Sequence, residues 1–179
     1  MKTVLFLIGL ASFYINTVLA QAPRTLNSVD YVKHNQIFLT HGSQKINIGK
    51  LTPSSIVKLL GKPLSIKKEM TETDGLLVVY RYDGCEIDFD KSYLNSVSIT
   101  KDKWAFYMMP NEKAAHTFRV KESISSLKNF FPKSWKNHQL EGLALMVKDT
   151  SGEINPYIWI TFMTDENQVK SIIYAFNNY

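Results

Sequence analysis

Residues 76–100, with the sequence LLVVYRYDGCEIDFDKSYLNSVSIT, decide the fold class of this chain, because apolar and polar side chains alternate through three successive segments. Asp83-Gly84 and Lys91-Ser92 form the short links between those segments. Links of this length force neighbouring strands to run antiparallel. The alternation predicts a core face that carries Ile87, Phe89, Val97 and Ile99, and an opposite face that carries Glu86, Asp88, Ser96 and Ser98.

A short helix is expected immediately before this antiparallel meander. Thr52 suits the N-cap, and Pro53 suits the first helical position because no hydrogen bond is lost there. Gly61 predicts the end of the helix. Apolar residues recur at helical spacing at Ile56, Leu59 and Leu60. A β-hairpin over residues 36–48 and a strand over residues 65–70 complete this half of the chain.

The second half of the sequence repeats this order of elements. A helix is predicted from Ser123, and Pro132 is expected to end it. Strands are predicted over residues 140–148, 157–163 and 169–176. We therefore predict an α+β fold of two tandem helix-plus-antiparallel-sheet units, with a sheet face open to a partner. The predicted divisions are a signal peptide (1–20), a lead-in with the first strand (21–43) and two α+β repeats (44–109 and 110–179).

The first 20 residues, MKTVLFLIGLASFYINTVLA, are typical of a secretory signal peptide. Lys2 supplies the positive start, an apolar run follows, and cleavage is expected after Ala20. The apolar run is shorter than the roughly 20 residues of a bilayer span, so no stable membrane anchor is expected. A single cysteine, Cys85, excludes an intramolecular disulfide. We expect a periplasmic or secreted protein.

The charged residues point to neither nucleic-acid binding nor catalysis. The formal net charge of +5 is spread over separated lysines, whereas nucleic-acid binding needs a basic cluster. The four histidines lack metal-ligand spacing, and no Gly-x-Ser-x-Gly motif is present. We therefore expect no enzyme activity, no cofactor and no metal site. Glu86, Asp88 and Asp90 share one strand face, which allows calcium binding or acid–base chemistry, but a solvated outer face is the simpler interpretation.

Aromatic residues are the strongest candidates for a binding surface. In the strand over residues 157–163, Ile158, Ile160 and Phe162 share the core face, which leaves Tyr157 and Trp159 on the opposite face. Trp104 and Tyr107 belong to a second aromatic cluster near the middle of the chain. Tyrosine, tryptophan and arginine are favoured at the centres of protein interfaces. The alternative is that Trp104 and Trp159 fill the seam between the two units.

The sequence also resembles a known superfamily. Leu59-Leu60-Gly61-Lys62-Pro63 ends the first helix, and Tyr82-Asp83-Gly84 leads into Ile87-x-Phe89. With the tandem order of elements, these motifs resemble the β-lactamase-inhibitor-protein-like (BLIP-like) and BamE/SmpA superfamily over residues 44–176. The second half departs from the motif, with Phe131-Pro132-Lys133-Ser134 in the matching place.

The resemblance implies a protein that binds other proteins and is not an enzyme. It favours an exported inhibitor or immunity protein whose partner is an enzyme or a toxin. Under this hypothesis, buried anchors and orienting charges are supplied by Tyr157, Trp159, Trp104, Tyr107, Arg81, Glu86 and Asp88. The alternative is a cell-envelope scaffold or assembly factor of BamE type, which the absence of a lipid-anchor cysteine after residue 20 disfavours. A third class is a small-molecule carrier or hydrolase that works in a cleft between the units.

Overall fold

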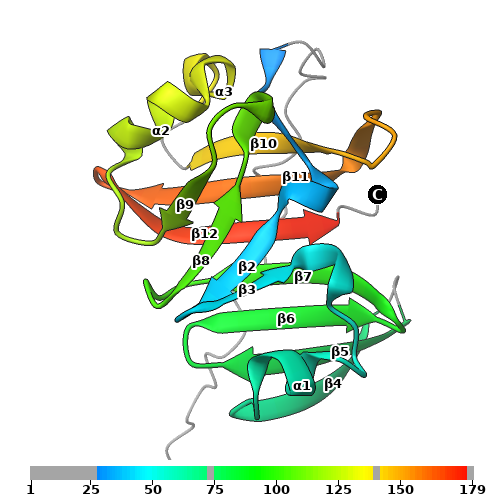
Figure 1. Cartoon of the computed structure of the whole chain (residues 1–179). Helices are drawn as coiled ribbons and strands as arrows, with labels where there is room; N and C mark the ends of the chain where they lie inside the picture. The colour runs from blue at the N-terminus through cyan, green and yellow to red at the C-terminus, as the bar shows by residue number, and fades with distance from the viewer. Residues whose placement is uncertain (1–27, 72–74, 139–141, 177–179) are drawn as a thin grey trace, which may run out of the picture.

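The computed structural model describes residues 28–71, 75–138 and 142–176, and it shows a mostly-β fold (Figure 1). Strands account for 54% of the described residues and helices for 19%, so helices are minor elements. The strands form one eight-stranded sheet and one four-stranded sheet. The predicted signal peptide lies outside the described residues.

The eight-stranded sheet contains two antiparallel meanders joined side by side. Its spatial order is β1-β10-β11-β12-β7-β6-β5-β4, and every pairing is antiparallel except the parallel one between β1 and β10. Its strands are β1 (Tyr31–Lys33), β4 (Ser65–Thr71), β5 (Gly75–Tyr82), β6 (Cys85–Asp90), β7 (Tyr93–Ile99), β10 (Gly142–Lys148), β11 (Ile154–Asp165) and β12 (Gln168–Phe176).

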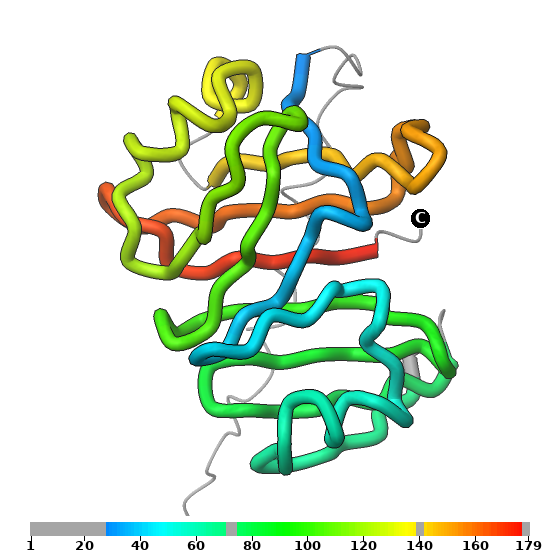
Figure 2. Tube along the Cα trace, in the orientation of Figure 1, coloured from blue at the N-terminus to red at the C-terminus, as the bar shows by residue number. Residues whose placement is uncertain are grey.

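The four-stranded sheet lies across the middle of the large sheet, as the chain trace in Figure 2 shows. Its strands, in spatial order, are β3 (Gln44–Asn47), β2 (Phe38–His41), β8 (Trp104–Met108) and β9 (His116–Arg119). The hydrophobic core fills the space between the two sheets. Leu39 and Phe106 from the small sheet, and Ile87 and Ile160 from the large one, are all fully buried in it.

Short helices complete the cover of the large sheet. They are η2 (His34–Gln36), η3 (Ile48–Lys50), α1 (Ile56–Leu60), η4 (Pro110–Glu112), α2 (Ile124–Phe130) and α3 (Pro132–Lys136). The turn that leads into α1 starts at Thr52, whose Oγ1 accepts a hydrogen bond from the Ser55 N–H at 3.1 Å. The helix ends at Gly61, whose φ of 81° is open to glycine but strained for other residues. These local signals keep α1 to little more than one turn.

The prediction of two tandem helix-plus-sheet units is wrong. Strand β12 pairs with β7, with Ile172 opposite Ile99, so the second meander extends the sheet of the first. Strands β8 and β9, from the end of the expected first unit and the start of the expected second one, combine with β2 and β3 into a sheet of their own. Two separate sheets would each leave additional strand edges with unpaired backbone groups, and joining them removes that cost.

Local elements were predicted more accurately than their arrangement. The hairpin over residues 36–48 is confirmed as β2 and β3, and the four strands between residues 65 and 100 are confirmed as β4 to β7. The predicted core-face side chains Ile87, Phe89, Val97 and Ile99 are all fully buried. The helix predicted from Ser123 is α2, and it ends at Phe130, just before Pro132. Pro132 then occupies the first position of a second helix, α3, which was not predicted.

Cys85 opens β6 and points into the core. Its side chain is 1% exposed, and burial is the main reason that the pKa of its thiol is raised above the ordinary value. This thiol is therefore protonated and shielded from solvent in the folded protein.

None of the helices in the described part of the chain is long and apolar enough to span a membrane.

Candidate protein-binding surface

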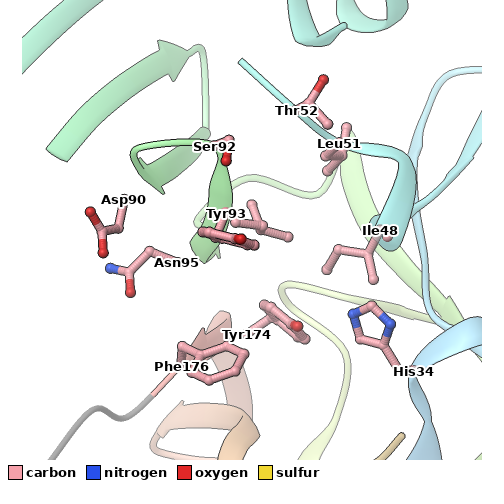
Figure 3. A pocket seen from close by; sticks show the side chains of 12 residues that line it. His34, Ile48, Leu51, Thr52, Asp90, Ser92, Tyr93, Asn95, Tyr174 and Phe176 are labelled. Atoms are coloured by element: carbon pink, nitrogen blue, oxygen red, sulfur yellow. The ribbon is translucent and has the colours of Figure 1, made fainter. Parts of the chain in front are cut away.

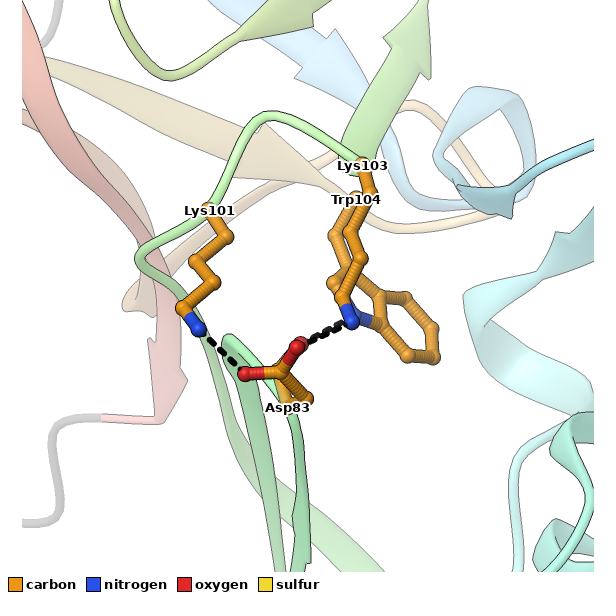
Figure 4. Close-up of polar contacts among 4 residues, drawn as sticks. All are labelled: Asp83, Lys101, Lys103 and Trp104. Carbon is orange, nitrogen blue, oxygen red and sulfur yellow. Dashed lines mark hydrogen bonds and ion pairs between the residues drawn. The ribbon is translucent and has the colours of Figure 1, made fainter.

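Trp104, one of the predicted anchors, is a core residue. Its side chain is 1% exposed, and its indole stacks on the His41 ring with the centroids 4.0 Å apart. The indole N–H donates to the Asp83 carbonyl oxygen at 2.9 Å. Figure 4 shows this ring beside Asp83, whose carboxylate forms ion pairs with Lys101 and Lys103. These lysines hold the pKa of Asp83 down at about 2. The arrangement ties the β5–β6 turn to the loop before β8, and it offers no surface anchor.

Tyr107 lies on the four-stranded sheet, away from the other predicted site residues. Its ring packs edge-on against Phe38 at a centroid distance of 6.0 Å, and the Lys45 ammonium sits 3.1 Å from its centroid. This cation–π contact occupies one face of the ring. Tyr107 is therefore engaged within its own sheet.

Tyr157 and Trp159 both belong to β11, on the face of the large sheet that points away from the core. Tyr157 is 51% exposed, whereas Trp159 is partly buried and donates its indole N–H to the Pro156 carbonyl oxygen at 2.8 Å. The prediction that Ile158 and Ile160 share the core face is confirmed. Tyr157 is thus the more accessible of the two aromatic side chains.

The predicted charged residues lie on the same outer face of the large sheet. Arg81 and Glu86 form a cross-strand ion pair with a Nε–Oε2 distance of 3.2 Å. Ser96 donates its hydroxyl to the Asp88 carboxylate at 2.6 Å. Burial raises the pKa of Asp88, and the Ser96 hydrogen bond only partly opposes this effect. Within the described residues, no three His, Cys, Asp or Glu side chains gather as a metal site requires.

The seven predicted site residues therefore do not form one surface. Arg81, Glu86, Asp88, Tyr157 and Trp159 share the outer face of the large sheet, but strands β12 and β7 separate Trp159 from Asp88. Trp104 is buried in the core, and Tyr107 lies on the other sheet.

Exposed apolar side chains gather instead at one end of the molecule, around strand β4. Among the described residues, seven large hydrophobic side chains are exposed, and five of them lie on α1, β4 or the segments beside them. We call these five the edge patch, and they are Val57 (43% exposed), Leu64 (76%), Ile66 (52%), Met70 (78%) and Leu76 (40%). Such clustering marks an interaction surface more often than scattered exposed residues do.

Strand β4 forms the outer edge of the large sheet. Among the described strands it pairs only with β5, and every residue from Leu64 to Met70 is exposed. The register places Ile66 opposite Tyr80 and Met70 opposite Leu76, so these side chains share the sheet face on which α1 lies. The Tyr80 hydroxyl fastens the start of the α1 region by donating to the Pro53 carbonyl oxygen at 3.3 Å.

Four lysines lie on or beside the elements that carry the edge patch. Lys58 on α1, Lys62 after it, and Lys67 and Lys68 on β4 are all exposed. Glu69 is the single acidic residue between positions 56 and 70, and Glu72 and Asp74 follow in the sequence before Leu76. The patch therefore combines apolar side chains, a strand edge that no other described strand covers, and exposed lysines.

Sequence patterns could not single out the edge patch. Leu64, Ile66 and Met70 fall in an alternating strand, and such alternation normally means that the apolar face is buried. In the folded chain this face is left exposed along β4, which a local pattern does not reveal. The one local signal is the pair Lys67-Lys68, because charged residues are frequent on edge strands.

Comparison with known proteins finds no match at any level: no family model matches the chain, and no curated protein or solved structure does so either. The resemblance to the BLIP-like and BamE/SmpA superfamily therefore stays a prediction.

Proposed function

We propose that this chain is an exported, non-catalytic protein-binding module of the inhibitor or immunity kind. Its docking surface is the edge patch, and its partner presents an acidic, partly apolar extended segment that adds to strand β4. The observation that carries the proposal is the exposure of Leu64, Ile66 and Met70 along a strand edge with which no other described strand pairs.

A strand is the occupant that uses all the features of the edge patch. The outer edge of β4 presents backbone N–H and C=O groups that an added strand would pair with. Alternate side chains of that strand would contact Ile66 and Met70 on the α1 side. Acidic residues in the partner would meet Lys67 and Lys68, which would speed association and set its orientation.

Two other occupants fit the edge patch less well. A second copy of this chain would bring its own Lys67 and Lys68 against the same lysines, and like charges directly opposite are destabilising. An anionic membrane would suit the lysines and the apolar side chains. It would leave the backbone edge of β4 without hydrogen-bond partners, because the hydrocarbon interior offers none.

Site-specific photocrosslinking tests the proposal. A photoreactive phenylalanine at position 66 should capture a partner protein in the native host, whereas the same group at position 157 should not. The captured protein, once purified, should bind the double variant Lys67→Glu, Lys68→Glu at least tenfold more weakly than wild type. This loss should shrink at high ionic strength, because the lysines act through exposed charges.

The matched control is the double variant Lys133→Glu, Lys136→Glu, which makes the same change of charge at two exposed positions of α3. It should bind like wild type. Capture from position 157 alone, or equal loss in both double variants, contradicts the proposal. A lipid surface would be the occupant under a different pair of results. The protein would co-sediment with phosphatidylglycerol vesicles, Met70→Asp would abolish this co-sedimentation, and position 66 would form no protein adduct.

A further inference from the structure

A pocket of about 500 Å³ opens where distant parts of the chain meet, and Figure 3 shows its lining side chains. The lining residues that matter here are Tyr174 and Phe176 at the end of β12, Asp90 and Tyr93 at the β6–β7 turn, and His34 and Ile48 from η2 and η3. The pocket shares no residue with the edge patch, so it is a separate feature of the surface.

The described lining of the pocket holds an acidic residue and no basic one, although the protein is basic. The chain contains 21 lysines and arginines, yet none belongs to the described lining of this pocket. Burial lowers the pKa of His34 below 6.5, so its imidazole is neutral at neutral pH. Burial also raises the pKa of Tyr174, so its phenol stays protonated. Asp90 is the only acidic residue among the described lining residues.

The Asp90 carboxylate has unused bonding capacity. Its Oδ1 atom is buried and accepts no hydrogen bond, and Asp90 belongs to none of the ion pairs of the described residues. Figure 3 shows Asp90 beside Asn95 at one side of the pocket. A cation in the pocket would give this carboxylate, which has no ion-pair partner among the described residues, a counter-charge.

Aromatic rings occupy the space between Asp90 and His34. Tyr93 is 76% exposed, whereas Tyr174 is 1% exposed. Phe176 lies next to Tyr174 in Figure 3. The faces of aromatic rings attract cations, and the attraction grows as the cation loses water. Rings and a carboxylate, without competing lysines or arginines, favour an ammonium group over an anion or a neutral solute.

We propose that this pocket binds a small organic cation, in which an ammonium group carried on an apolar body contacts the rings of Tyr93, Tyr174 and Phe176 and lies near the Asp90 carboxylate.

Choline and its neutral carbon isostere, 3,3-dimethylbutan-1-ol, test the proposal on the full mature chain. Choline should cause saturable shifts in the NMR signals of Tyr93 and Asn95, and the neutral isostere should bind at least tenfold more weakly. Asp90→Asn keeps the size of the side chain and should also weaken choline binding at least tenfold. Asp165→Asn removes a carboxylate from the exposed β11–β12 hairpin and should leave binding unchanged.

Three results would each overturn the proposal. They are the absence of saturable shifts at millimolar choline, equal binding of choline and its isostere, and unchanged choline binding in Asp90→Asn. Tyr93→Leu gives an independent check, because Tyr93 is largely exposed and its replacement leaves the core intact. This variant should lose affinity for choline, and unchanged affinity would equally contradict the proposal.

Discussion

At the scale of single residues, two aspartates on neighbouring parts of the large sheet have opposite environments. Asp83 is exposed and paired with Lys101 and Lys103, so its ionised form is favoured and its pKa falls to about 2. Asp88 is partly buried, so its protonated form is favoured and its pKa is raised. The ordinary pKa of an aspartate, about 3.8, lies between these two cases.

Replacing each aspartate by asparagine should therefore change the pH dependence of stability in opposite directions. The stabilisation from Asp83 is present above about pH 4 and is lost as the pH falls toward about 2. Asp88 affects the free energy of unfolding in the reverse way. The protein is most stable with respect to Asp88 below about pH 4, where the side chain is protonated, and this stability is lost as the pH rises through the raised pKa.

Urea unfolding at about pH 3 and about pH 7 measures this difference. From the lower to the higher pH, Asp83→Asn should lose stability relative to wild type, and Asp88→Asn should gain it. Ser96 can still donate to the new amide oxygen in Asp88→Asn, so that variant keeps its hydrogen bond. A change of the same sign in both variants would contradict the assignment of the two environments.

At the scale of elements, backbone conformation decides where α1 ends. Gly61 has φ 81° and ψ −172°, a combination that is essentially restricted to glycine. A Cβ atom at this position would meet no neighbouring atom within 4 Å. The requirement for glycine is therefore a matter of backbone conformation and not of space.

Gly61→Ala should destabilise the protein by about 1–3 kcal/mol, through backbone strain alone. Gly42→Ala is the matched control, because Gly42 also has positive φ (58°) and no atom within 4 Å of the added Cβ. Gly42 lies in the left-handed region that other residues can adopt, so its replacement should cost only about 1 kcal/mol. Urea unfolding compares the two, and equal costs would show that strain at Gly61 does not matter.

The sequence predicts these local elements because their signals lie within a few residues of one another. Thr52, Pro53 and Gly61 bound the turn and helix of α1, and Asp83-Gly84 marks the β5–β6 turn. Pairing between β12 and β7 has no such signal, because it joins residues more than 70 positions apart. For the same reason the sequence leaves the burial of Trp104 as one of two alternatives: the strand that carries the stacked His41 lies far away in sequence.

Local sequence patterns do not predict the two candidate binding surfaces either. Alternation correctly places Trp159 and Asp88 on the outer face of the large sheet, but it does not say what covers a face. Ile66 is exposed although α1 lies on the same face of the sheet, and the pocket beside Asp90 is lined by residues from β12, the β6–β7 turn and η3. Both features arise from packing between separate segments.

At the scale of the whole molecule, one continuous large sheet and a second sheet across it enclose a single core. Phe118 of the small sheet illustrates this. Its ring centroid lies 5.5 Å from the centroid of Phe162 in β11 and 5.1 Å from the centroid of Phe131, which follows α2. Trp104 of the same small sheet lies 5.6 Å from Tyr82 in β5. The small sheet thus contacts both meanders.

Unfolding should therefore be a single cooperative transition. One variant retains only Trp104, with Phe at positions 135 and 159, and a second retains only Trp159, with Phe at positions 104 and 135. In each variant, the urea midpoint from tryptophan fluorescence should match the midpoint from far-UV circular dichroism. Distinct midpoints would show that the two meanders unfold separately, and this result would contradict the prediction of a single cooperative core.

The buried thiol of Cys85 can report on local and global unfolding of this protein, because its reaction with a reagent requires that the core be exposed. A small alkylating reagent can modify it only after β6 separates from its neighbours or from the sheet that covers it, since the folded chain shields the sulfur. Alkylation rates measured in native buffer would then give the frequency of the rare fluctuations that expose the interior, without denaturant or an added probe.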